Sequence, residues 1–221
     1  MHIRMMIVIF ILESLFLVPA QAVASDLEPI RLMPARIERG LTVMQALKLR
    51  QSSRQFSPKD LPLPVLSDLL WAAWGVNRPD SGKRTAPSPK NWQEIDVYVV
   101  MQKGVYLYNA QEHTLEPVRR GDIRKLTGNQ RFVDTAPVNL IFVADFSKIG
   151  LTAIAGTKED DKEAFGATDA AFISQNVYLY CASEGLATVA RGDLDRNILA
   201  KAMKLRPHQR IVFAQTVGYP Q

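Results

Sequence analysis

The alternation of apolar and polar positions divides the chain into helical and extended segments. Four segments have the length and apolar spacing of helices, at 42–49, 65–74, 165–184 and 194–203. Five runs rich in β-branched and aromatic residues predict strands, at 95–101, 105–108, 114–118, 138–144 and 210–217. A shorter helix is expected over 121–126. This mixture predicts an α+β fold with a mostly antiparallel central sheet flanked by helices.

Prolines and clustered charges mark the connections. Prolines exclude a helix interior at 57–64 and predict an ordered loop of fixed shape at 84–93. Clustered charges indicate a mobile surface segment over 147–163. Residues 25–41 are polar and contain prolines, so we expect an extended N-terminal arm ahead of one domain spanning 42–221.

The first 24 residues have the pattern of a secretory signal peptide. A basic start is followed by an apolar block and then by small residues, which favours cleavage after Ala22 or Ala24. A membrane anchor is the alternative, but the apolar block is short for a span and contains Glu13. We therefore expect a periplasmic or secreted protein with no stable membrane span after cleavage.

Charge and cysteine content narrow the function classes. The net charge of +5 mildly favours anionic ligands. The basic residues are scattered along the sequence, so nucleic acid is not an expected partner. Cys181 is the single cysteine, so no intrachain disulfide can form, and its apolar neighbours predict a buried thiol.

Several kinds of active site are absent from the sequence. It contains no G-x-G-x-x-G, no P-loop, no H-E-x-x-H and no G-x-S-x-G motif. His113 and His208 remain after the leader, and each is expected at the surface rather than on a metal. A metalloenzyme or a serine hydrolase would therefore lack obvious parts, and we expect no metal site.

One candidate for ligand binding is the segment after the first predicted helix. If helical spacing continues, Arg50 and Arg54 share a face, and their guanidinium groups with the Ser52 hydroxyl suit a phosphate. Taken alone, two arginines four residues apart also fit a solvated surface.

Two further segments could hold a large polar cofactor. Residues 87–93 offer hydroxyl and amide groups for a heterocycle or a sugar chain, from Ser88, Asn91 and Gln93. Small residues at 185–192 would let backbone N–H groups approach a flat ring. Ordinary turn chemistry or a connection between helices explains the same residues without a ligand.

A set of short segments occurs in a characteristic order between residues 42 and 220. They are 49–56, 69–76, 84–88, 97–100, 104–108, 112–116, 136–138, 175–176, 185–189 and 217–220. In this order they resemble the nitroreductase family of FMN-dependent oxidoreductases, and its SagB-type branch in particular.

The resemblance implies a homodimer that binds FMN at the subunit interface with residues of both chains. It implies phosphate contacts from Arg50, Gln51, Ser52 and Arg54. It also implies contacts to the ribityl chain and the ring edge from Pro87, Ser88 and Asn91. The strip expected beside the flavin is Ala190, Arg191 and Gly192.

The chemistry that the resemblance implies needs no identified catalytic side chain, because the flavin itself carries the hydride. NAD(P)H or another donor would reduce FMN and leave, and an electron-poor small molecule, such as a nitro compound or a quinone, would then take the electrons. Pro89-Lys90 departs from the small residues usual in relatives, and Arg191 is expected to place a cation near the ring. The alternatives are a non-catalytic flavin- or partner-binding protein and azoline dehydrogenase-like oxidation of a peptide.

Overall fold

The fold is built on a seven-stranded sheet. The computed structural model describes residues 27–150 and 158–221, so the expected signal peptide lies outside the described residues. The strand order is β1-β6-β5-β4-β7-β9-β8, and all neighbouring strands run antiparallel. The strands of this sheet are β1 (Ile30–Arg31), β4 (Ile95–Met101), β5 (Gly104–Asn109), β6 (Thr114–Arg120), β7 (Val138–Asp145), β8 (Ala187–Arg191) and β9 (Gln209–Gly218). The predicted α+β class is confirmed.

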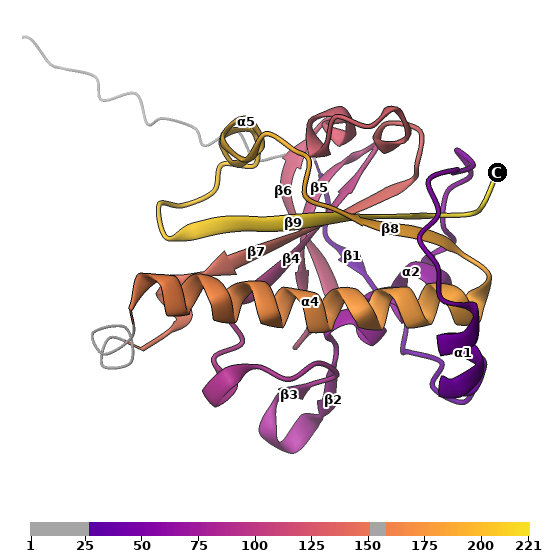
Figure 1. Ribbon diagram of the computed structural model, residues 1–221, viewed down its shortest axis with the longest axis horizontal. Coiled ribbons are helices and arrows are strands. Elements are labelled where there is room, and N and C mark those ends of the chain that lie inside the picture. Colours follow the sequence, from indigo (N-terminus) through magenta and orange to yellow (C-terminus); the bar gives the residue numbers. More distant parts are fainter. Residues whose placement is uncertain (1–26, 151–157) are drawn as a thin grey trace, which may run out of the picture.

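Helices cover both faces of this sheet. In Figure 1, α4 runs along one face with α1 beside its C-terminal end, and α5 lies on the other face. The helices are α1 (Val43–Leu49), α2 (Leu63–Trp74), α4 (Glu159–Glu184) and α5 (Arg196–Ala202). A small hairpin of β2 (Val76–Arg78) and β3 (Lys83–Arg84) follows α2. Single 3₁₀ turns are η1 (Pro79–Ser81), η2 (Pro89–Asn91), η3 (Arg124–Thr127), η4 (Arg131–Val133) and η5 (Phe146–Lys148).

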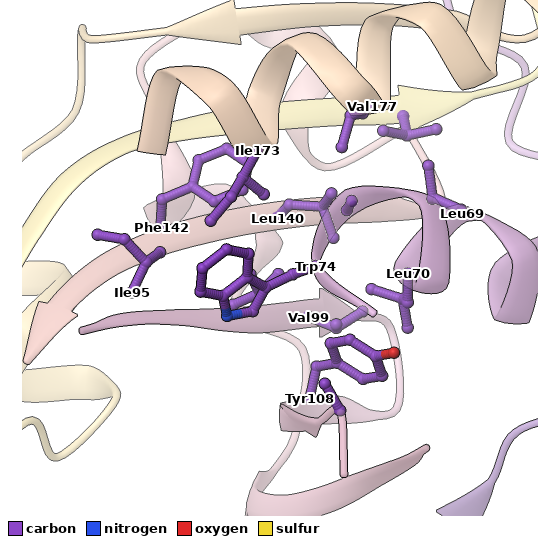
Figure 2. Packing of buried hydrophobic residues seen from close by; sticks show 14 of the residues in the cluster. Leu69, Leu70, Trp74, Ile95, Val99, Tyr108, Leu140, Phe142, Ile173 and Val177 are labelled. Carbon is purple, nitrogen blue, oxygen red and sulfur yellow. The ribbon is translucent and has the colours of Figure 1, made fainter. Parts of the chain in front are cut away.

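The near-continuous apolar run of β7 explains why this strand is central. Leu140 and Phe142 face the core beneath α2 and α4, where Figure 2 shows them beside Trp74 and Ile173. Val143, on the opposite side of the strand, belongs to the core beneath α5. A strand buried on both faces needs apolar residues at consecutive positions, and every residue of β7 is buried.

The longest helix begins earlier than its apolar pattern predicts. The predicted helix starts at 165, but α4 starts at Glu159 and ends at Gly185, which adopts the left-handed conformation (φ 68°) typical of a helix C-cap. The expected mobile segment at 147–163 is thus wrong over its last residues, because an exposed first turn needs no apolar residue. Residues 151–157 lie outside the described part of the chain.

Helix α1 ends at Leu49, as predicted, and helical spacing does not continue through Arg50 to Arg54. Thr42 and Gln45 form a capping box at the start of α1, and Arg50 is already outside the helical conformation (φ −56°, ψ 120°). The Ser53 N–H then donates to Thr188 O of β8 at 2.9 Å. The prediction that Arg50 and Arg54 share a helical face is therefore wrong, because pairing with β8 replaces the next helical turn.

Smaller differences have local causes. The helix expected over 121–126 is only the 3₁₀ turn η3, which follows Gly121 at φ 98°. Helix α2 begins at Leu63 because Pro64, in its first turn, needs no N–H partner there. Part of the expected arm pairs with β6 as strand β1. Within the described residues, no helix is both long and apolar enough to cross a membrane.

Candidate functional site

The hydroxyl of Tyr178 joins three distant segments at the C-terminal part of α4. It lies 2.9 Å from the Ser52 hydroxyl, and it accepts a hydrogen bond of 2.9 Å from the Ala190 N–H of β8. The Arg50 guanidinium lies over the Tyr178 ring, 5.4 Å from its centroid. The predicted phosphate segment and the predicted flavin strip thus meet on one side chain.

A cavity of about 260 Å³ opens at this junction. It is lined by residues of the segment after α1, of α4 and of β8, among them Gln51, Ser53, Tyr178, Gly185 and Thr188. The same segment contains both arginines, of which Arg54 is exposed and Arg50 is half-buried. Guanidinium and hydroxyl groups are strong donors to phosphate oxygens, so the segment beside this cavity has donors suited to a phosphate.

Arg191 does not point toward the Tyr178 side of β8. Successive side chains of a strand point to opposite faces, and the Arg191 guanidinium lies buried on the face opposite Ala190. It donates to Thr127 O at 2.7 Å, Asn139 Oδ1 at 3.0 Å and Thr216 Oγ1 at 2.9 Å. Burial lowers its pKa to about 10. Arg191 therefore ties β8 to β7, β9 and η3, whereas Gly192 beside it is exposed.

The loop at 87–93 has the most unusual backbone of the described residues. Lys90, Asn91 and Gln93 all have positive φ, at 49°, 56° and 49°. Such conformations cost on the order of 1–3 kcal/mol each in non-glycine residues and gather at functional sites. Gln93 is held by its N–H to Ser88 Oγ at 2.9 Å and by the Arg84 Nε donor at 2.8 Å. The fixed shape of this loop was predicted from its prolines.

This loop rests on the N-terminal half of α4. Trp92 packs edge-on against Phe165, with ring centroids 5.7 Å apart. The Ser88 hydroxyl donates to Glu94 Oε2 at 3.2 Å, and Asp169 of α4 contacts both residues. Glu94 and Asp169 are each only 1% exposed. Burial, and secondly the Glu94 charge, raise the pKa of Asp169 to about 7.

The structure therefore brings together only some of the predicted site residues. Asp169 and Tyr178 are nine positions apart, which is about 14 Å along α4. One group gathers at Tyr178, namely Arg50, Gln51, Ser52 and Ala190, with Arg54 at the end of the same segment. The other group, Pro87, Ser88 and Asn91, sits at the Asp169 end.

Sequence reasoning missed Tyr178, Glu94 and Asp169. A tyrosine in a long helix is usually interpreted as a core residue. The polar contacts of Tyr178 could not be foreseen, because they come from segments far away in sequence. The available signal for Asp169 was a lone carboxylate inside an alanine-rich run. His113, expected at the surface, is half-buried and bonds both the Tyr108 hydroxyl and Met33 O at 2.9 Å, and burial lowers its pKa. Cys181 is buried, as predicted.

Comparison with known proteins gives a consistent result. A sequence model described as "Nitroreductase family" matches residues 47–219. A crystal structure from Ralstonia eutropha JMP134, provisionally named a nitroreductase, is 42% identical, covers 90% of this chain and 93% of its own, and superposes with a TM-score of 0.82. A provisionally named nitroreductase of Methanocaldococcus jannaschii is 27% identical over 169 residues, which is 72% of this chain and 82% of that protein.

A more distant neighbour shares the fold alone. It is the Escherichia coli microcin synthetase McbBCD complex with truncated pro-MccB17 bound, at 21% identity and a TM-score of 0.67, covering 78% of this chain and 70% of that one.

Proposed function

Because the chain belongs to the nitroreductase family, we propose that it is an exported FMN-dependent oxidoreductase working as a homodimer. It would pass electrons in two alternating half-reactions from NAD(P)H or another donor to an electron-poor acceptor such as a nitro compound or a quinone. The SagB-type branch is part of this proposal, on the strength of the segments quoted above.

The observation that carries the proposal is the junction at Tyr178. Its hydroxyl contacts both Ser52 and Ala190, so the phosphate segment and the flavin strip are held at a fixed separation on one chain. A ligand that carries both a phosphate and a flat ring would contact both segments. Arg50 and Arg54 would balance the phosphate charge, with Gln51 at the cavity wall.

A second copy of the chain is proposed to complete the site. The cavity of about 260 Å³ falls below the roughly 300–1,000 Å³ typical of sites for ligands of this size. The Pro87–Asn91 loop lies at the other end of α4, so it would reach the flavin of the partner rather than its own. The α1 side chains Val43 (67% exposed), Met44 (74%) and Leu47 (46%) form an apolar face that a partner would cover.

The residues of this chain would bind and orient rather than react. When bound, FMN supplies the hydride and electron chemistry. Arg50, Ser52 and Arg54 would hold its phosphate, and Tyr178 would keep β8 in place at the Ala190 N–H. The fully bonded Arg191 would keep the far side of the same strand rigid.

The test is the absorbance spectrum of the purified protein after reconstitution with FMN. We expect oxidised-flavin bands that bleach with a reduced donor and return with a nitro or quinone acceptor. Absence of flavin binding would refute the proposal, whereas a bound flavin that no donor reduces would favour a non-catalytic flavin-binding protein. Azole formation on a peptide would favour azoline dehydrogenase-like oxidation.

Export is tested separately by expressing the full sequence and determining the N-terminal residue of the periplasmic product. We expect a start at Val23 or Ser25. A product that keeps Met1 and stays in the cytoplasmic fraction would refute export.

A further inference from the structure

Two carboxyl groups meet in the interior without the donors that two carboxylates need. Five buried side-chain oxygens among the described residues have no hydrogen-bond partner, and three of them belong to Glu94 and Asp169. Both oxygens of Asp169 are without a donor, although this side chain is 1% exposed. Buried polar groups are almost always bonded, so this exception needs a physical explanation.

The hydrogens in the neighbourhood are already committed. Ser88 has one hydroxyl hydrogen, which it donates to Glu94 Oε2 at 3.2 Å. The Gln93 N–H is donated to Ser88 Oγ at 2.9 Å. Asp169 lies within hydrogen-bonding reach of Ser88 and Glu94, but the single Ser88 hydroxyl hydrogen can serve only one of the two carboxyl groups, and an ionised Glu94 has none to give. A contact between two carboxyl groups is satisfied only when one of them carries a proton.

The surrounding charges do not neutralise the pair. Among the described residues, Glu94 is the charged group that acts on Asp169. The charged side chains nearby have partners of their own: Arg84 of β3 with Gln93, Lys90 of the loop over Trp92, Lys148 of η5 with Asp96 of β4, and Arg206 with Asp145 of β7. Two adjacent buried carboxylates without a cation would be strongly disfavoured, so one proton must stay with the pair.

We propose that Asp169 keeps a proton which it donates to Glu94, and that this carboxyl pair latches the strained 88–93 loop onto α4. Glu94 holds Ser88, Ser88 holds the Gln93 N–H, and Lys90 and Asn91 lie between them at positive φ. Loss of the proton places two like charges against each other beneath the loop and releases it. The link to flavin binding rests on the proposed function, which places this loop beside the flavin.

The pH dependence has a defined sign. The pKa of Asp169 in the folded protein is about 7, whereas an unfolded Asp has a pKa of about 3.9. The stabilisation from the bound proton is therefore complete below pH about 4 and is lost as the pH rises through 7. In that window the folding equilibrium constant falls about tenfold for each pH unit through this group alone.

Two substitutions of Asp169 distinguish the effect of its proton from the effect of its packing. Asp169→Asn puts an amide donor where the protonated carboxyl would be, so it should keep the loop closed at every pH. Asp169→Ala removes the donor and should leave Glu94 and Ser88 without their partner. Asp161→Asn, at an exposed position of the same helix, is the matched control.

The first experiment needs no flavin binding. Infrared spectroscopy of the purified protein should show a protonated carboxyl C=O stretch at pH 6 that is present in Asp161→Asn and absent in Asp169→Asn. Thermal unfolding from pH 5 to 8 should show a stability loss in wild type that Asp169→Asn lacks. An identical infrared spectrum for wild type and Asp169→Asn, or parallel pH profiles, would overturn the latch. So would stabilisation of wild type alone by Mg²⁺ or Ca²⁺, which would mean that the pair holds a cation.

The second experiment tests the consequence for the flavin. The FMN dissociation constant of wild type should rise by up to about tenfold per pH unit above pH 7, and that of Asp169→Asn should not. Equal pH profiles would overturn the link between the latch and the flavin. If no variant binds FMN at any pH, the proposed function fails, while the infrared result still decides whether Asp169 holds the proton.

Discussion

The charged groups beside the two halves of α4 differ in sign and in their access to solvent. Near Tyr178 the charges are positive and reach solvent, and the hydroxyl of the half-buried Tyr178 bonds both Ser52 and Ala190. Near Asp169 the charges are negative and sealed, and three carboxyl oxygens have no partner. The Tyr178 half would suit an anion arriving from solvent, whereas the Asp169 half is proposed to hold an internal proton. One rigid helix can therefore support a binding site and a positioning site that respond to different conditions.

The largest expected effect is on ligand affinity at the exposed half. Arg50→Ala with Arg54→Ala should weaken FMN binding by about 3–6 kcal/mol, because charge-assisted contacts are worth roughly 1.5–3 kcal/mol each. The melting temperature without flavin should barely change, since neither side chain is buried. Isothermal titration and thermal unfolding measure both quantities. An unchanged FMN dissociation constant would refute the phosphate assignment.

Two matched serine substitutions, one beside each half of α4, should differ in their effect on the free energy of unfolding. Ser88→Ala removes the donor to Glu94 and the acceptor of the Gln93 N–H, so the free energy of unfolding should fall by about 1–3 kcal/mol. Ser52→Ala lies on the surface and should change stability by less than about 0.5 kcal/mol while lowering FMN affinity. Denaturant unfolding compares the two. Equal stability losses would contradict the contrast between the halves.

The Tyr178 hydroxyl, which connects the phosphate segment to β8, should contribute less to stability than Ser88 does. Tyr178→Phe removes the acceptor of the Ala190 N–H and should cost about 1 kcal/mol of stability together with a loss of FMN affinity. Tyr180→Phe is the control, because its hydroxyl bonds Val65 O at 3.2 Å and touches no part of the proposed site. If both variants bind FMN equally well, Tyr178 has no role beyond packing.

The smallest effect concerns the strained loop. Lys90→Gly should raise stability by up to about 1 kcal/mol, because glycine adopts positive φ without strain. Lys204→Gly, also at positive φ but remote from the loop, should give a similar gain. Only the Lys90 variant should alter the flavin spectrum or the rate of reduction. Identical spectra and rates in the two variants would show that the loop conformation does not matter for the reaction.

Local patterns predicted the fold well because hydrophobic periodicity is a local signal. The strand at Ile95–Met101 has the predicted ends, and β7 differs from its prediction by one residue. Strand β8 was expected only as a small, extended strip, because its pairing with β9 gives it a regular structure that its short sequence does not suggest. The end of α1 at Leu49 was predicted, but the extended path after it was not, since Thr188, the partner of Ser53, is far along the chain.

The candidate site was predictable in its parts but not in its connections. Arginine and serine types reveal what Arg50, Ser52 and Arg54 can bind. Nothing in the sequence shows that Tyr178 meets Ser52, or that Glu94 meets Asp169, because each contact depends on how α4 crosses the sheet. The direction of Arg191 followed from strand alternation only once β8 was known to be a strand.

The segment that follows α1 is fastened by residues made much later in synthesis. Besides the bond from Ser53 to Thr188, the Ser57 N–H donates to Tyr219 O at 2.9 Å, and Phe56 forms a bridge with Pro220. During translation the segment therefore stays unanchored until residues near 220 have left the ribosome. Contacts of such long range form slowly, because loop closure must precede them. The ability to capture an anion should thus be among the last properties that a newly made chain acquires.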